Sequence, residues 1–90
     1  MFEITIKNKK YYVEKSKRKY KKYDVYDKDE KYIISFGDTR YENYKDKLGL
    51  YSKLDHEDKD RQENYLKRSK GIGNINNPKS ANFWSRNILW

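Results

Sequence analysis

The chain of 90 residues carries 22 basic and 14 acidic side chains, a net charge of +8, together with ten tyrosines, three phenylalanines and two tryptophans. This length predicts one small domain, residues 1–90, whose modest core is built mainly from aromatic side chains. One histidine and no cysteine exclude a disulfide framework and argue against a zinc site, so neither a metal nor a cofactor is expected. The chain shows no signal peptide and no apolar run long enough for a membrane span, which predicts a soluble protein within a cell or particle.

Period-two patterns in residues 1–37 predict about four antiparallel strands. Apolar and polar residues alternate strictly in residues 2–6, and a turn at Asn8-Lys9 leads to a second short strand at residues 11–13. The run KSKRKYKKY, residues 15–23, is expected to form a solvated loop or an edge strand. Residues 23–26 and 32–36 flank a polar run and predict a hairpin that ends at Gly37.

Residues 38–90 predict two or three short helices. Tyr41, Tyr44, Leu48 and Tyr51 are spaced as one helix face, which predicts a helix from Arg40 to Leu48, capped by Asp38 or Thr39 and ended by Gly49. A second helix is expected from an N-cap at Asp55, through an acidic first turn and a basic last turn, to a stop at Gly71.

The last helix is expected to begin after an N-cap at Ser80, with Ala81, Trp84 and Ile88 on one face. Two tryptophans in the last seven residues predict a C-terminus docked on the core. The elements together predict an α+β fold, with the sheet in residues 1–37 and the helices in residues 38–90. The predicted core is Tyr23, Tyr32, Phe36, Tyr44, Tyr65, Trp84 and Trp90.

The net charge is concentrated near the start of the chain, where the segment from Lys7 to Lys22 holds nine cations and one anion. The cations are Lys7, Lys9, Lys10, Lys15, Lys17, Arg18, Lys19, Lys21 and Lys22. Basic side chains neutralise phosphates, and interleaved tyrosines stack on unpaired bases. The segment therefore predicts a sequence-independent contact with nucleic acid or an acidic partner. The alternative is that the lysines solubilise an edge strand and the tyrosines pack in the core, which is the favoured interpretation of the tyrosines.

A second candidate site is the acidic group Asp55, His56 and Asp58 with Arg61. Carboxylates beside a histidine bind divalent metals or perform acid–base chemistry on a phosphodiester. The favoured alternative is an acidic first helical turn with surface ion pairs, because spacing within one helix does not show that carboxylates converge. Gly71-Ile72-Gly73 resembles a phosphate loop only superficially, since no strand precedes it and no helix follows closely.

One part of the chain, from about Tyr23 to the C-terminus, resembles a small uncharacterised protein family of large DNA viruses and tailed bacteriophages. The resemblance follows a pattern of FG, a tyrosine pair with KDK-x-G-x-Y, then DH-x-D, an arginine, a tyrosine, an arginine and a final Leu-Trp. Here these are Phe36, Gly37, Tyr41, Tyr44, Lys45, Asp46, Lys47, Gly49, Tyr51, Asp55, His56, Asp58, Arg61, Tyr65, Arg68, Leu89 and Trp90. The chain departs from the pattern at Gln62, where members often have arginine, and at Ser69, where they often have histidine. The resemblance implies a viral or phage setting and carries no assigned function.

These observations favour a non-enzymatic, capsid-associated virion component, located in the virion or in the host cytoplasm during infection. Its expected partners are other virion proteins and, through residues 7–22, nucleic acid. No membrane partner is expected, and the oligomeric state is left open. The alternative is a metal-dependent enzyme acting on nucleic acid through Asp55, His56, Asp58 and Arg61. An inhibitor of a host nucleic-acid-binding protein is a third possibility, although its usual acidic surface does not match this basic chain.

Overall fold

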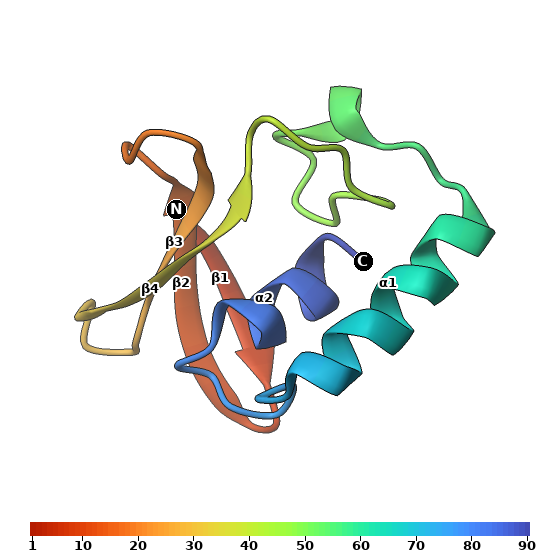
Figure 1. The fold of residues 1–90 in the computed structure, drawn as a ribbon. Coiled ribbons are helices and arrows are strands. Elements are labelled where there is room, and N and C mark those ends of the chain that lie inside the picture. Colours follow the sequence, from red (N-terminus) through yellow and green to blue (C-terminus); the bar gives the residue numbers. More distant parts are fainter.

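A computed structural model describes residues 1–90 and contains one sheet and two α-helices (Figure 1). Four antiparallel strands occur in the order β1-β2-β3-β4: β1 Phe2–Ile6, β2 Lys9–Lys15, β3 Lys21–Tyr26 and β4 Tyr32–Asp38. The 3-10 helix η1, Ser52–Leu54, is followed by α1, Lys59–Ile72, and α2, Ala81–Ile88. The predicted α+β fold, with an N-terminal four-stranded sheet and C-terminal helices, is confirmed.

The helix α2 lies between the sheet and α1, and residues 39–58 cross one end of the molecule (Figure 1). Trp84 joins α2 to the sheet, because its ring centroid lies 4.9 Å from that of Tyr11 and 6.2 Å from that of Phe36. On its other side α2 is held to α1 by Arg86, whose guanidinium donates to the Leu66 carbonyl at 2.8 Å. The core therefore forms around α2.

The core only partly matches the aromatic set expected from the sequence. Tyr23, Phe36 and Trp84 are fully buried, as predicted, whereas Tyr32 is 44% exposed. Tyr44, Tyr65 and Trp90 are half-buried. The prediction missed Tyr11, Val13, Val25, Phe83, Ile88 and Leu89, which are all buried. These residues come from β2, β3, α2 and the residue after α2, and form one cluster with Tyr23, Phe36 and Trp84.

The strand predictions are correct in number and wrong in some bounds. The first turn is Lys7-Asn8, not Asn8-Lys9, and both residues have the positive φ of a two-residue hairpin turn, 51° and 64°. The strand β2 extends beyond the predicted residues 11–13 to Lys9–Lys15. Residues 16–20 form a loop between two interior strands, so the edge-strand alternative for this run is wrong.

The helix predicted from Arg40 to Leu48 does not form. Side-chain carboxylates bind the backbone instead: Asp46 accepts hydrogen bonds from the backbone N–H groups of Leu48 at 2.9 Å and Tyr51 at 2.8 Å. The backbone N–H of Asp46 in turn donates to the Asp55 carboxylate at 2.8 Å. Asp side chains that bind nearby N–H groups compete with a helix, and here the competing conformation is completed by contacts with the rest of the fold.

The helix α1 begins three residues later than predicted. Its N-cap is Asp58, whose carboxylate accepts from the backbone N–H groups of Asp60 and Arg61, and Asp55 belongs to the preceding segment. The helix runs through Gly71 to Ile72, and its C-cap is Gly73, so Gly71 does not stop it. The Gly71-Ile72-Gly73 run is therefore a helix end. Neither α-helix has the length and apolar character required to cross a membrane.

The predictions for the last helix are confirmed. Ser80 caps α2, with its hydroxyl accepting from the Asn82 backbone N–H at 3.2 Å. The following residues are docked, since Leu89 is 2% exposed and the Trp90 ring stacks on Tyr65 with centroids 4.2 Å apart. The C-terminal residues therefore connect α2 to α1.

Candidate nucleic-acid interface

The fold divides the basic segment between the two ends of β2. Lys7, Lys9 and Lys10 lie at its start, and Lys15 at its end. Seven residues in extended conformation separate these groups by about 20 Å. The nine predicted cations are therefore not one continuous patch.

The group at the start of β2 is mixed with acidic side chains. Lys10 pairs with Glu3 at 3.1 Å. A cavity beside this turn is lined by Lys9 and Lys10 from one hairpin and by Asp27, Lys28 and Asp29 from the next. Mixed charges at short range give a weak field for a polyanion, so this end is the less suitable of the two.

The other end carries exposed cations with no ion-pair partner. Lys15, Lys17, Arg18, Lys19 and Lys21 are all exposed, and none lies within 4.0 Å of a carboxylate oxygen. We call these five residues, together with Arg40 beside them, the basic loop cluster. Their proximity produces a strong local positive potential that attracts phosphates with salt-dependent affinity.

Backbone hydrogen bonds give the loop a defined shape. The Ser16 N–H donates to the Lys22 carbonyl and the Lys21 N–H to the Arg18 carbonyl, at 3.0 and 3.2 Å. The Tyr20 carbonyl accepts from the Thr39 N–H at 3.0 Å, which ties the loop to the end of β4. The cations therefore project from a folded turn.

Arg40 extends the cluster and was not found from the sequence. Its guanidinium carbon lies 4.2 Å from the Tyr20 ring centroid, and its Nε and Nη2 donate to the two oxygens of Asp38 at 3.0 and 2.8 Å. Hydrogen bonds from the Arg40 side chain and backbone lower the pKa of Asp38 to about 2. Asp38 therefore stays ionised at neutral pH and holds Arg40 in place against Tyr20.

Exposed aromatic rings accompany these cations. Tyr20 is 43% exposed, Tyr32 44% and Tyr41 65%. Arg18 lies over the Tyr32 ring at 5.0 Å and Arg40 over the Tyr41 ring at 5.8 Å. Tyr11 and Tyr23, by contrast, are buried in the core. The prediction that the tyrosines of the basic segment pack in the core is therefore confirmed for those two and wrong for Tyr20.

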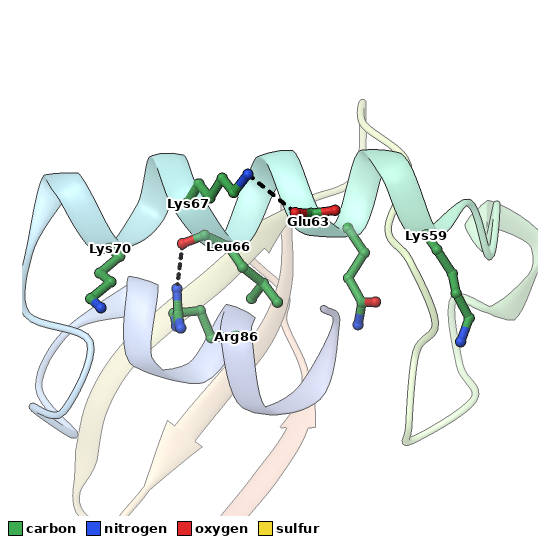
Figure 2. A pocket seen from close by; sticks show the side chains of 7 residues that line it. Lys59, Glu63, Leu66, Lys67, Lys70 and Arg86 are labelled. Carbon is green, nitrogen blue, oxygen red and sulfur yellow. Dashed lines mark hydrogen bonds and ion pairs between the residues drawn. The ribbon is translucent and has the colours of Figure 1, made fainter.

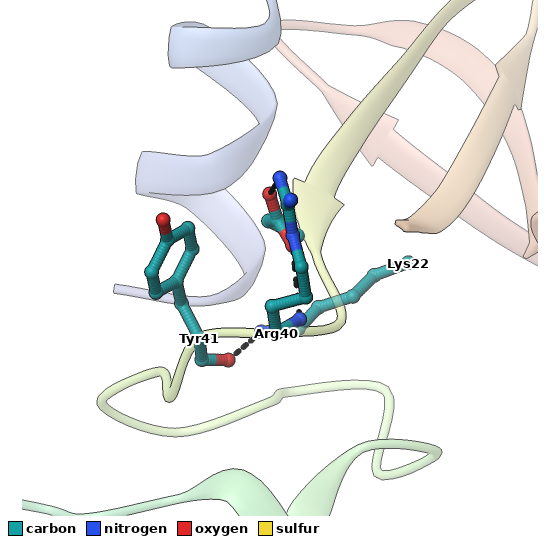
Figure 3. A network of polar contacts seen from close by, with 4 residues as sticks. Lys22, Arg40 and Tyr41 are labelled. Carbon is teal, nitrogen blue, oxygen red and sulfur yellow. Dashed lines mark hydrogen bonds and ion pairs between the residues drawn. The ribbon is translucent and has the colours of Figure 1, made fainter. Parts of the chain in front are cut away.

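Lys22 does not belong to the interface, although the sequence placed it there. It is 2% exposed, and its ammonium donates to the Tyr41 carbonyl at 3.0 Å and to Asn43 Oδ1 at 2.7 Å. Figure 3 shows Lys22 reaching the backbone beside Arg40 and Tyr41. Burial lowers the pKa of Lys22, and the nearby carboxylate of Asp46 opposes that shift. Lys22 therefore stabilises the fold, because its ammonium is already bound to these two acceptors.

Lys22 leads into a buried polar network beneath residues 41–55. Asn43 is fully buried and donates to the Asp55 carboxylate. Asp46, 4% exposed, accepts from the Tyr23 hydroxyl at 2.5 Å. Burial and this hydrogen bond raise the pKa of Tyr23. The network pairs the buried donors and acceptors with one another, as a polar core requires.

The acidic candidate residues have separate structural roles. Asp55 accepts from Asn43 and from the Asp46 backbone, and Asp58 caps α1. The His56 Nδ1 accepts from the Asp58 N–H at 2.9 Å, and Arg61 pairs with Glu42 at 3.1 Å. The structure contains no group of three or more His, Asp or Glu side chains placed to hold a metal ion. The geometry therefore adds no support to the enzyme alternative.

A cavity of about 480 Å³ between α1 and α2 also carries basic residues (Figure 2). Its charged groups are mostly engaged, because Glu63 pairs with Lys67 at 3.1 Å and Arg86 binds the α1 backbone. Gln62 and Ser69, the two departures from the family pattern, also serve the contact between the helices. The Gln62 amide donates to the Trp90 carbonyl at 2.7 Å, and the Ser69 hydroxyl accepts from Arg86 at 2.7 Å.

Comparison of the chain with models of protein families, with curated proteins and with solved structures finds no match in any of the three. The resemblance to the viral and phage family therefore stays a prediction. Of its residues, Asp46, Asp55 and Asp58 bind backbone N–H groups, so this part of the pattern corresponds to structural positions.

One signal in the sequence could have located Arg40. The β3–β4 hairpin register pairs Lys21 with Asp38, so continuing the predicted hairpin by two residues places the end of β4 beside the basic loop. No local pattern, however, distinguishes the buried Lys22 from the exposed Lys21.

Proposed function

We propose that the chain is a small non-enzymatic binding protein, a capsid-associated component of a virus or phage particle, that contacts nucleic acid through the basic loop cluster. The observation that carries the nucleic-acid contact is that five of its six cations, those from Lys15 to Lys21, are exposed and pair with no carboxylate. The proposal that the protein is part of a particle is supported by the resemblance of the chain, from about Tyr23 to the C-terminus, to the viral and phage family. Acidic surfaces of other virion proteins are the second class of partner for the same cluster.

The contact is independent of base sequence. Lysine ammonium groups on long side chains neutralise phosphates wherever these lie, and phosphate contacts position a protein without reading bases. Four of the six cationic groups in the cluster are lysines. Affinity is therefore expected to fall steeply as salt is raised.

Charge reversal tests the contact. In the first variant Lys15, Lys17, Lys19 and Lys21 are changed to Glu. The matched control changes Lys28, Lys31, Lys53 and Lys79, which are also exposed, to Glu and alters the net charge equally. Fluorescence anisotropy with a labelled single-stranded oligonucleotide measures the dissociation constant across a salt series. We expect the first variant to lose about tenfold or more in affinity and to show a shallower salt dependence, by about 0.7 per lost phosphate contact.

The control variant is expected to bind within a few-fold of the unaltered protein. Equal losses in the two variants would mean that only net charge matters, and unaltered binding by the first variant would refute the interface. Whether the protein is a component of virus or phage particles is tested separately, by mass spectrometry of purified particles with determination of its copy number. Many copies per particle would support a structural role, and absence from particles would refute it.

A further inference from the structure

A pocket of about 310 Å³ adjoins the basic loop cluster and has no role in the contact described above. It is lined by the end of the β3–β4 hairpin, the residues after β4, α1 and the C-terminal end of α2. We propose that this pocket accepts one unpaired base of a single-stranded nucleic acid whose phosphates lie on the basic loop cluster. The proposal rests on the proposed function and adds to it a preference for single strands.

The pocket offers one exposed aromatic ring, that of Tyr41, which is 65% exposed. Its other two rings, Tyr65 of α1 and Trp90 after α2, stack on each other with centroids 4.2 Å apart and an interplanar angle of 11°, and form part of the pocket wall. The Arg68 guanidinium carbon lies 5.8 Å from the Tyr65 ring centroid. Aromatic rings and guanidinium groups are the surfaces on which proteins stack unpaired bases, independently of sequence.

Polar groups in the pocket suit a base better than an acidic side chain. Glu42 Oε1 accepts from Arg61 at 3.1 Å, and its second oxygen accepts no hydrogen bond from the protein. A carboxylate oxygen in this position accepts from the N–H groups of a base edge. The Glu42 and Asp38 carboxylates, which both line the pocket, would repel a carboxylate of an acidic peptide, so the observations favour a base.

The pocket is continuous with the basic loop cluster. Lys21 belongs to both. Arg40 lies over the Tyr20 ring at 4.2 Å and over the Tyr41 ring at 5.8 Å, so one guanidinium links the loop to the pocket. A strand whose phosphates bind the loop is therefore held where one of its bases reaches Tyr41. A duplex base pair, whose bases stay stacked, cannot make this contact.

The test compares two labelled single-stranded DNA oligonucleotides, one intact and one of equal length with abasic sites throughout. Anisotropy titrations use the unaltered protein, Tyr41→Ala, and Tyr12→Ala as a matched control. Tyr12 lies on β2, outside both the pocket and the cluster. We expect intact DNA to bind about tenfold more tightly than abasic DNA, and Tyr41→Ala to remove most of this difference. Because Tyr41 is 65% exposed, its variant is expected to melt normally.

Four outcomes would overturn the proposal, and they differ from one another. Equal binding of intact and abasic DNA, lost on charge reversal of the loop, would remove the pocket and leave the proposed function standing. Equal weakening of both oligonucleotides by Tyr41→Ala would mean that Tyr41 acts only through Arg40. Binding of neither oligonucleotide would overturn both proposals. A dimer in sedimentation that Tyr41→Ala dissociates would make the pocket an interface between copies of the chain.

Discussion

Two charged segments meet at the same end of the sheet and use their charges in opposite ways. The loop of residues 16–20 presents its cations to solvent, whereas residues 39–58 turn Asn43 and Asp46 into the interior. The adjacent residues Lys21 and Lys22 divide between the two segments, one exposed and one 2% exposed. Charge in the sequence therefore does not identify an interaction surface. A charged side chain is available to a partner only where the fold does not bury it against hydrogen-bonding groups, as it does for Lys22.

The greatest loss of stability is expected when the buried polar network beneath residues 41–55 loses the Asp46 carboxylate. Asp46→Ala removes the acceptor for the backbone N–H groups of Leu48 and Tyr51 and for the Tyr23 hydroxyl. Leaving buried donors unpaired costs about 1 to 3 kcal/mol each, so we expect the free energy of unfolding to fall by about 3 kcal/mol or more. Urea denaturation measures it. The exposed Asp60 provides the control, and Asp60→Ala is expected to change stability by less than about 0.5 kcal/mol. Similar losses in the two variants would contradict the network.

The adjacent lysines provide the sharpest test of the comparison. Lys22→Met leaves the Tyr41 carbonyl and Asn43 Oδ1 without their donor, and we expect it to destabilise the protein by about 2 kcal/mol. Lys21→Met removes an exposed cation and is expected to leave stability within about 0.5 kcal/mol. Binding to single-stranded DNA should show the reverse order under conditions where both variants are folded. If the two variants behave alike in both assays, the division between the segments is wrong.

The smallest expected effect concerns Asp38, at the boundary of the two segments. Its folded pKa is lowered to about 2 by hydrogen bonds from Arg40, below the usual value of about 3.9. The carboxylate thus contributes stability that is fully present above the unfolded pKa and is lost as pH falls through about 2. We expect Asp38→Asn to melt slightly below the unaltered protein at pH 7, and the difference to disappear near pH 2. A difference that stays constant from pH 7 to pH 2 would show that the carboxylate charge plays no part.

Local patterns predicted the parts of the fold that depend on neighbouring residues. Alternation in residues 2–6, the polar turn before Tyr32 and the cap at Ser80 all correspond to observed elements. They succeed because strand alternation and capping depend on residues only a few positions apart. The helix predicted from Arg40 to Leu48 does not form, because the carboxylates of Asp46 and Asp55 bind backbone N–H groups in a non-helical conformation. Asp55 lies outside the predicted helix, so the hydrophobic spacing within that helix could not reveal its effect.

Patterns in the amino-acid sequence were enough to predict the four strands, the last helix and the concentration of positive charge in residues 7–22. Which of these charges are exposed to a partner depends on how the chain folds. The tertiary structure separated Lys7, Lys9 and Lys10 from the loop by the length of β2, buried Lys22, and added Arg40 from the far side of a hairpin. The physical reason is that the exposure of a side chain depends on contacts with residues distant in sequence, and here residues 39–58 supply them.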